Sequence, residues 1–137
     1  MAPLIVTAAI ICQHGRVLVT QRPATARHGG LWEFPGGKLE ADETPTAALQ
    51  RELREELDLP VTVGSIFDVV HYRYDWGAVL ILAYRCTPAA AAQIRNLQVA
   101  DHRWLLPEEL ATLPFLPADQ PLIERLQRQA AGAPGGA

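Results

Sequence analysis

The sequence is short of positive charge, and this shortage narrows the class of partner. Twelve Lys and Arg residues stand against fifteen Asp and Glu residues, which gives a net charge of -3 over 137 residues. A protein that binds the backbone of a nucleic acid polymer usually carries a broad basic surface. We therefore expect no nucleic acid polymer as partner. A small anionic ligand remains compatible with local positive charge and a metal ion.

Cysteine is also scarce. Only Cys12 and Cys86 occur, each inside an apolar run typical of a strand. We interpret both as buried small hydrophobic side chains rather than parts of a disulfide framework or a zinc site. This usage fits a reducing compartment, and we expect a cytoplasmic protein.

Long hydrophobic runs are missing as well. The apolar stretch 3–12 is too short to cross a bilayer, and no basic segment of the kind that opens a signal peptide precedes it. We interpret it as a strand and expect no membrane association. The chain length suits one domain with a single core, which we place at 1–130. The glycine-rich segment 131–137 is expected to be a disordered tail.

Hydrophobic patterning predicts strands before and after one central helix, with a second long helix at the end. Thr44 offers an N-cap and Pro45 a first helical residue, and Gly64 suggests a bulge within a strand. The order of elements predicts an α+β fold, an αβα sandwich around a mixed sheet. The strands are expected at 4–11, 17–20, 31–34, 61–70, 71–74, 79–86 and 103–106, the first two as a hairpin around His14-Gly15. The helices are expected at 46–57, 107–113 and 119–130, and 89–100 is expected to be a loop.

Three carboxylates crowd one stripe of the central helix. Glu52, Glu55 and Glu56 stand at i, i+3 and i+4, where like charges repel. A cation would offset this repulsion, and oxygen ligands alone suit Mg²⁺ or Mn²⁺ rather than zinc. The alternative is a solvated acidic helix surface, since Arg51 and Glu55 also have ion-pair spacing.

The spacing around these carboxylates resembles the Nudix signature, G-x5-E-x7-R-E-U-x-E-E-x-G-U, in which U is aliphatic. Asp58 replaces the second glycine of that pattern, and Asp is among the few other residues that tolerate a left-handed C-cap. The turn should therefore survive at a modest cost. The matching positions are Gly37, Glu43, Arg51, Glu52, Leu53, Glu55, Glu56 and Leu59.

The resemblance implies a Nudix-type αβα sandwich from about Leu4 to Arg128, with the signature on the central helix. It also implies that the three glutamates bind the metal and that the backbone of Gly36 or Gly37 approaches it. Arg51 would then orient a carboxylate, with a surface ion pair as the alternative. For Glu43 we favour a structural role at the start of the helix.

A second resemblance concerns the nucleotide. Gln21-Arg22-Pro23 and the segment 30–38 look like those of the MutT-type and CTP pyrophosphohydrolase branches, where the equivalent of Arg22 lies in the nucleotide pocket. Lys38 could reach phosphate oxygens or face solvent, and Phe34 could stack on a base or belong to the core. Asp119 resembles the base-reading residue of MutT-type proteins, and it could equally cap the last helix.

The general base is left open by the sequence. MutT-type enzymes carry a glutamate six residues before a tryptophan, and Gln98 occupies that position relative to Trp104. Glutamine cannot accept the proton. The alternatives are a glutamate of the signature, Asp101 or His102 in the same loop, or water made acidic by the metal.

Together these features predict a Mg²⁺-dependent, MutT-like nucleoside triphosphate pyrophosphohydrolase that releases a nucleoside monophosphate and pyrophosphate. The expected substrate is an oxidised or modified nucleotide of the 8-oxo-dGTP type, which implies a role in cleaning the nucleotide pool, or a pyrimidine such as CTP. The alternatives are a hydrolase of dinucleoside polyphosphates or nucleotide sugars, and a non-catalytic reader of nucleotides or lesions. No pattern indicates the oligomeric state.

Overall fold

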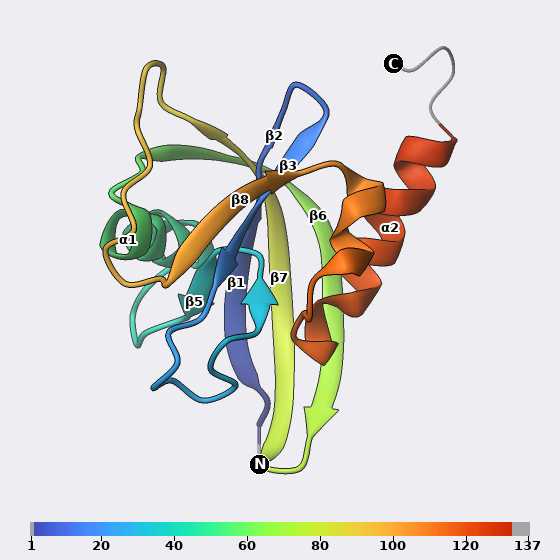
Figure 1. Cartoon of the computed structure of the whole chain (residues 1–137). Coiled ribbons are helices and arrows are strands. Elements are labelled where there is room, and N and C mark those ends of the chain that lie inside the picture. The colour runs from blue at the N-terminus through green and yellow to red at the C-terminus, as the bar shows by residue number, and fades with distance from the viewer. Residues whose placement is uncertain (1, 133–137) are drawn as a thin grey trace.

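A computed structural model describes residues 2–132 of the chain. Its two β-sheets lie between two α-helices, with α1 on one side and α2 on the other (Figure 1). The predicted αβα sandwich is therefore confirmed. Of the predicted tail, Ala131 ends a helix and Gly132 lies in a turn, whereas 133–137 lie outside the described residues.

The larger sheet has four strands in the order β5-β1-β7-β6. The β1 and β7 strands run parallel, and the pairs β1/β5 and β6/β7 are antiparallel, so the sheet is mixed as predicted. The strand bounds are Leu4–Ile10 for β1, Gly36–Lys38 for β5, Val61–Tyr74 for β6 and Gly77–Pro88 for β7.

The smaller sheet is built around β3. This strand pairs with β2, β4 and β8, all antiparallel. The bounds are Cys12–Gln13 for β2, Arg16–Gln21 for β3, Trp32–Glu33 for β4 and Asp101–Leu105 for β8. The predicted turn at His14-Gly15 is confirmed, and both residues have positive φ, 53° and 77°.

The prediction that the first long strand pairs with the second as a hairpin was wrong. Only the two residues of β2 form the hairpin with β3, whereas β1 joins the other sheet between β5 and β7. The reason lies in the composition of β1, which is apolar on both faces. Strands of that kind are buried on both sides, as central parallel strands usually are.

Two helices cover the two faces of the β1 strand. Ala9 packs toward the leucines of α1 (Pro45–Leu57), and Ala8 and Ile10 belong to the cluster that contains the leucines of α2 (Gln120–Ala131). This alternation is the period of two that a strand imposes. Two short 3₁₀ helices, η1 (Pro107–Thr112) and η2 (Pro117–Asp119), lead into α2.

The ends of α1 follow the sequence signals closely. The Thr44 side chain accepts a hydrogen bond from the backbone N–H of Ala47, and Pro45 is the first helical residue. Asp58 adopts the left-handed conformation at φ 52°, and its N–H donates to the carbonyls of Arg54 and Leu53. The helix therefore ends where the signature has glycine, with Asp accepting the same backbone geometry.

Two further expectations meet different outcomes. Cys86 is buried as predicted, but Cys12 is exposed, because it lies in a two-residue strand at the margin of the smaller sheet. The predicted bulge near Gly64 is confirmed by shifts in the β6/β7 register on both sides of Ile66. Among the helices of 2–132, none is both long enough and apolar enough to cross a membrane.

Candidate functional site

The glycine pair that follows β4 lies directly against two neighbours. A Cβ atom on Gly37 would overlap the carboxylate of Glu52, and one on Gly36 would overlap the carbonyl oxygen of Thr7 in β1. The hydroxyl of Thr7 also donates to the Gly37 carbonyl at 3.1 Å. Glycine at position 36 is therefore required for the close approach to the β1 backbone, whereas at Gly37 a larger residue would displace the Glu52 carboxylate.

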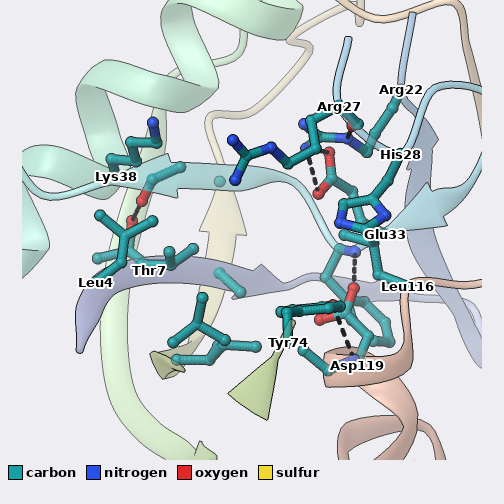
Figure 2. A pocket seen from close by; sticks show the side chains of 18 of the residues that line it. Leu4, Thr7, Arg22, Arg27, His28, Glu33, Lys38, Tyr74, Leu116 and Asp119 are labelled. Carbon is teal, nitrogen blue, oxygen red and sulfur yellow. Dashed lines mark hydrogen bonds and ion pairs between the residues drawn. The ribbon is translucent and has the colours of Figure 1, made fainter. Parts of the chain in front are cut away.

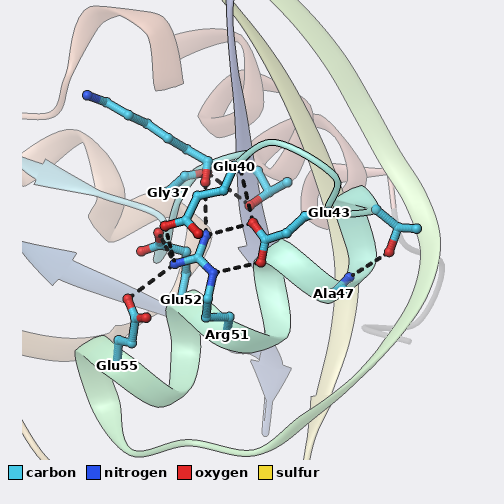
Figure 3. Close-up of polar contacts among 10 residues, drawn as sticks. Gly37, Glu40, Glu43, Ala47, Arg51, Glu52 and Glu55 are labelled. Carbon is cyan, nitrogen blue, oxygen red and sulfur yellow. Dashed lines mark hydrogen bonds and ion pairs between the residues drawn. The ribbon is translucent and has the colours of Figure 1, made fainter.

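Arg51 is the centre of an ion-pair network on α1 (Figure 3). Its Nε and Nη2 donate to the two oxygens of Glu43, at 2.7 and 2.9 Å. Its Nη1 donates to Glu52 at 2.9 Å and to Glu55 at 3.2 Å, and Nη2 also reaches the Lys38 carbonyl at 3.1 Å. The guanidinium thus holds the loop after β5 against the helix while orienting two carboxylates.

Glu43 acts within this network as a structural anchor. One of its oxygens also accepts the N–H of Glu40 at 3.0 Å. The hydrogen bonds from Arg51 lower the pKa of Glu43, and the same bonds raise the pKa of Arg51. The contacts agree with the structural role that we favoured for Glu43, and they show why glutamate at this spacing fits the arginine.

Glu52 and Glu56 are partly buried, at an electrostatic cost. Burial raises the pKa of Glu56 to about 9, with further contributions from the charges of Glu33 and Glu52. Burial also raises the pKa of Glu52, against the opposing effect of Arg51. Carboxylates that repel one another away from water hold protons unless a cation is near.

The donor chemistry around Glu52 and Glu56 fits a hard divalent cation. The available ligands are carboxylate and carbonyl oxygens, which Mg²⁺ and Mn²⁺ prefer, and the mutual repulsion of the carboxylates would be relieved by positive charge. Within 2–132 no three His, Cys, Asp or Glu side chains converge on one point as a ready-made ligand set. Such sites complete their coordination with waters or substrate phosphates.

A pocket of about 310 Å³ is lined by apolar residues of the core cluster that contains the α2 leucines and by Gly37, whose backbone lies against Glu52 (Figure 2). The side chains of Glu52, Glu55 and Glu56 are not among its lining residues. The pocket is lined by β1, the loop 22–30, the segment 33–38, the β6/β7 hairpin and η2. Lys38 and Asp119 lie toward opposite ends of the pocket in Figure 2. The pocket therefore has a cationic end next to the glycine loop and an acidic end next to α2.

Asp119 forms the acidic end. Its side chain is only 4% exposed, and its Oδ2 accepts the backbone N–H of Phe34 at 3.3 Å. It makes no side-chain hydrogen bond to the first turn of α2. Burial raises its pKa well above the usual value, and the charge of Glu33 adds to this. Its side chain therefore does not cap the helix, which was one of the two expected roles. It lines the pocket instead.

The other predicted pocket residues are also brought together. Arg22 and Lys38 both line the pocket, and Arg22 forms an ion pair with Glu33 at 3.2 Å. The Phe34 side chain is 3% exposed and packs in the core, 5.9 Å from Phe115 between ring centroids. For Phe34 the core placement predominates, and its backbone reaches Asp119.

Sequence reasoning missed a wall of stacked rings at the pocket mouth. Trp76 and Tyr74 stack with centroids 5.3 Å apart and 7° between planes, and the Arg27 guanidinium lies 4.6 Å from the Trp76 centroid. His28 packs on the other side of Tyr74, at 5.1 Å. The sequence signal for this wall is a tryptophan in a tight hairpin turn. A side chain in such a turn is exposed, whereas most tryptophans are buried in the core.

Glu33 was also missed. It lies between the buried residues Trp32 and Phe34, and burial raises its pKa to about 6. A charged residue between two buried aromatics in a short strand is the signal that could have singled it out, since such a carboxylate needs a partner.

The candidates for the general base lie apart from the pocket. The backbone N–H of Gln98 donates to the Glu56 carbonyl at 3.1 Å, which fastens this loop to the end of α1. His102 contacts Asn96 through Nδ1 at 2.6 Å, and Asp101 lies 3.6 Å from Arg103. Neither Asp101 nor His102 is among the residues that line the pocket.

Comparison with known proteins assigns the family. The model of the NUDIX domain matches residues 1–126. The chain is 42% identical over 132 residues to a protein of Escherichia coli named CTP pyrophosphohydrolase, covering 94% of this chain and 95% of the relative. It is 47% identical over 70 residues to the 8-oxo-dGTP diphosphatase of Proteus vulgaris, covering 50% of this chain and 62% of the relative.

Comparison with solved structures also finds proteins of similar fold. The solution structure of the Escherichia coli ORF135 protein superposes with a TM-score of 0.82 at 36% identity, over 98% of this chain and 96% of that chain. The signature from Gly37 to Leu59, which differs at Asp58, the sandwich around it and these relatives agree with one another. The chain belongs to the Nudix family, whose members use divalent metal ions to act on small nucleotide substrates, and it is a Nudix hydrolase.

Proposed function

We propose that this protein is a MutT-type nucleoside triphosphate pyrophosphohydrolase that uses Mg²⁺, with Mn²⁺ as a substitute, and releases a nucleoside monophosphate and pyrophosphate. The observation that supports the proposal is one pocket that contains the buried Asp119, Lys38 and Gly37, with the Gly37 backbone lying against the Glu52 carboxylate of α1. Asp119 marks one end, and Lys38 and the glycine loop mark the other.

The base would be recognised at Asp119. As a carboxylate this residue accepts hydrogen bonds, so it favours bases that present donors, such as the amino group of cytosine or the N–H and amino groups of guanine. If its raised pKa keeps a proton on it, the same side chain offers one donor as well. CTP and 8-oxo-dGTP are therefore the two substrates that we propose, and the names of two relatives point to the same pair.

The phosphates would be held by Arg22 and Lys38 on one side and by the α1 carboxylates through metal on the other. Glu52, Glu55 and Glu56, with the backbone of Gly36 or Gly37, are the groups that would hold the metal. The bound ion would neutralise the polyphosphate and stabilise charge that develops on its oxygens. Arg51 would keep Glu52 and Glu55 in place through the bonds described above.

The proton acceptor is proposed to be a glutamate of the signature. Gln98 has no group that accepts the proton, and Asp101 and His102 lie outside the α1 carboxylate cluster, with Asp101 near Arg103 and His102 against Asn96. Among residues 2–132, Glu56 has no ion-pair partner, whereas Glu52 and Glu55 are paired with Arg51. We therefore propose Glu56 for this role, because within the described part of the chain no guanidinium occupies its carboxylate as Arg51 occupies those of Glu52 and Glu55.

A panel of triphosphates tests the proposal. CTP, dCTP, dGTP, 8-oxo-dGTP, ATP and UTP would be incubated with Mg²⁺ and scored for pyrophosphate against phosphate release. We expect pyrophosphate, with CTP or 8-oxo-dGTP ranked first. Release of phosphate alone, or turnover of dinucleoside polyphosphates with none of the triphosphates, would contradict it.

A further inference from the structure

The guanidinium of Arg22 is held at two of its three nitrogens. Its Nε donates to the Arg27 carbonyl at 2.7 Å, and its Nη1 donates to both oxygens of Glu33 at 3.2 Å. Across residues 2–132, the Nη2 nitrogen has no hydrogen-bond partner. Arg22 lines the pocket, and Glu33 lies beside it (Figure 2).

The pairing of β3 with β4 fixes where Glu33 lies relative to Arg22. Thr20 faces Glu33 in the register, and the N–H of Arg22 donates to the Leu31 carbonyl at 2.9 Å, which extends the same ladder. Trp32, next to Glu33, is 3% exposed. The Glu33 side chain is itself only 18% exposed, so it has little freedom to leave its partner.

A clamped arginine binds an anion at lower entropic cost than a free one. An arginine side chain samples many rotamers, and ordering it on ligand binding reduces affinity. A carboxylate that already holds the guanidinium removes most of this loss from the binding step, which is the principle of preorganisation. The Arg27 carbonyl supplies a second fixed point.

We propose that Glu33 is a positioning residue, which holds Arg22 so that the free Nη2 donates to phosphate oxygens of the nucleotide. This inference rests on the proposed function and deepens it, because it names the residue that prepares the pocket for the polyphosphate. Glu33 also lies close enough to Glu56 for its charge to be felt there. The experiment must therefore separate action through Arg22 from action on the α1 carboxylates.

A double-mutant cycle makes this separation. The variants are Arg22→Ala, Glu33→Gln and the two combined, with kcat and KM measured for CTP and for 8-oxo-dGTP and Tm measured by thermal unfolding. We expect Glu33→Gln to raise KM about 10-fold with kcat changed less than about 2-fold, as loss of preorganised binding would do. In the Arg22→Ala background Glu33→Gln should have no further effect on KM.

The matched control is Glu109→Gln. It breaks another arginine-glutamate pair, with Arg16 at 3.0 Å, whose residues are not among those lining the pocket. Its KM should equal that of the unchanged protein. Arg22→Lys supplies a second variant, because lysine keeps the charge but cannot be clamped at two nitrogens. Its KM should rise nearly as far as in Arg22→Ala.

Three outcomes would overturn the inference. In the first, Glu33→Gln raises KM in the Arg22→Ala background as much as it does in the unchanged protein. In the second, Glu33→Gln lowers kcat and changes the Mg²⁺ requirement. In the third, Arg22→Lys keeps the KM of the unchanged protein. If the Glu33 variants fail to fold, the Arg22→Lys result alone decides. Failure of the proposed function is distinct, since the unchanged protein would then release no pyrophosphate from either triphosphate.

Discussion

The signature on α1 and the pocket beside it are built in opposite ways. The signature uses residues 37–56, which form a single loop and helix. Within it, Arg51 binds carboxylates that precede it in the sequence and carboxylates that follow it. The pocket gathers Arg22, Phe34 and Asp119 from segments that only the folded sheets bring together. Under the proposed function, the chemistry at the phosphates would therefore depend on local spacing, whereas recognition of the nucleotide would depend on tertiary structure.

The two regions also differ in how negative charge is balanced. At the signature, Glu43 of the loop before α1 and Glu52 and Glu55 of the helix share the Arg51 guanidinium. At the pocket, Asp119 has a backbone N–H as its hydrogen-bond donor, and burial raises its pKa. The comparison teaches that Glu52 and Glu55 are already oriented by Arg51 without a ligand. In the pocket, a ligand can supply hydrogen-bond partners that Asp119 does not find in the described part of the protein.

The largest effect is expected from the α1 side. Glu56→Gln keeps the size of the side chain and removes its charge, so kcat should fall by about 1,000-fold, as loss of several kcal/mol of metal-dependent stabilisation implies. Steady-state kinetics with Mg²⁺ measure this. The exposed Glu124→Gln on α2 is the control and should keep full activity. Activity within about 2-fold of the original in Glu56→Gln would mean that the carboxylates of α1 do not carry the chemistry.

Breaking the pocket should change selectivity more than rate. In Asp119→Ala the buried acceptor is lost, and kcat/KM for the preferred triphosphate should fall about 100-fold, while poor substrates change little. The ranking of the triphosphate panel is the measurement. A ranking that survives the substitution would show that Asp119 does not read the base, even if all rates fall together.

The charge balance predicts a pH dependence of stability. Buried Glu33 has a pKa of about 6 and Glu56 of about 9, whereas the ordinary value is 4.5. Between the ordinary and the raised values the folded protein holds more protons than the unfolded chain. The free energy of unfolding of the metal-free protein should therefore fall as pH rises from about 4.5 to about 9.

Mg²⁺ should oppose this fall, because it stabilises the ionised carboxylates. The increase in Tm caused by saturating Mg²⁺ should be larger at pH about 8 than at pH about 5, and Glu56→Gln should flatten the metal-free dependence. Thermal unfolding followed by circular dichroism measures both. A metal-free Tm that rises steadily over the same range would contradict the burial of these charges.

The smallest effect concerns the end of α1. Asp58 has φ 52°, a conformation that costs a non-glycine residue roughly 1 kcal/mol. Asp58→Gly should therefore raise the free energy of unfolding by about 0.5 kcal/mol or slightly more, with kcat unchanged, and Asp58→Ala should lower it. Chemical denaturation resolves these differences. A loss of stability in Asp58→Gly would show that Asp58 makes a contribution beyond its backbone conformation.

The sequence predicts the local features of the signature well and the arrangement of the pocket poorly. The helix, its Thr44 cap and the left-handed Asp58 were predicted because each depends on neighbours within a few residues. The roles assigned to the α1 glutamates and to Arg22, Lys38 and Asp119 remain predictions, although the fold places them around one pocket and its adjoining cluster. Placing them there required the pairing of distant strands, which no local pattern encodes.

The misses have the same origin. The partner of β1 was wrong because an apolar run does not say which strand lies beside it, and Cys12 was wrong because a short strand at a sheet margin has the same composition as a buried one. Glu33 and Trp76 were overlooked as pocket residues because their significance comes from Arg22 and Arg27, which approach them only in the folded chain.

The four residues from Phe34 to Gly37 connect Asp119 to the α1 carboxylates through a short stretch of backbone. At one end the Phe34 N–H holds Asp119, and at the other Gly37 lies against the Glu52 carboxylate, with Gly36 wedged on β1 between them. The spacing between the Asp119 end and the Glu52 carboxylate is therefore set largely by this backbone, which Gly36 holds against β1. If both ends bind one molecule, the length of that molecule is selected by this segment, independently of any side chain that reads its base or holds its charge.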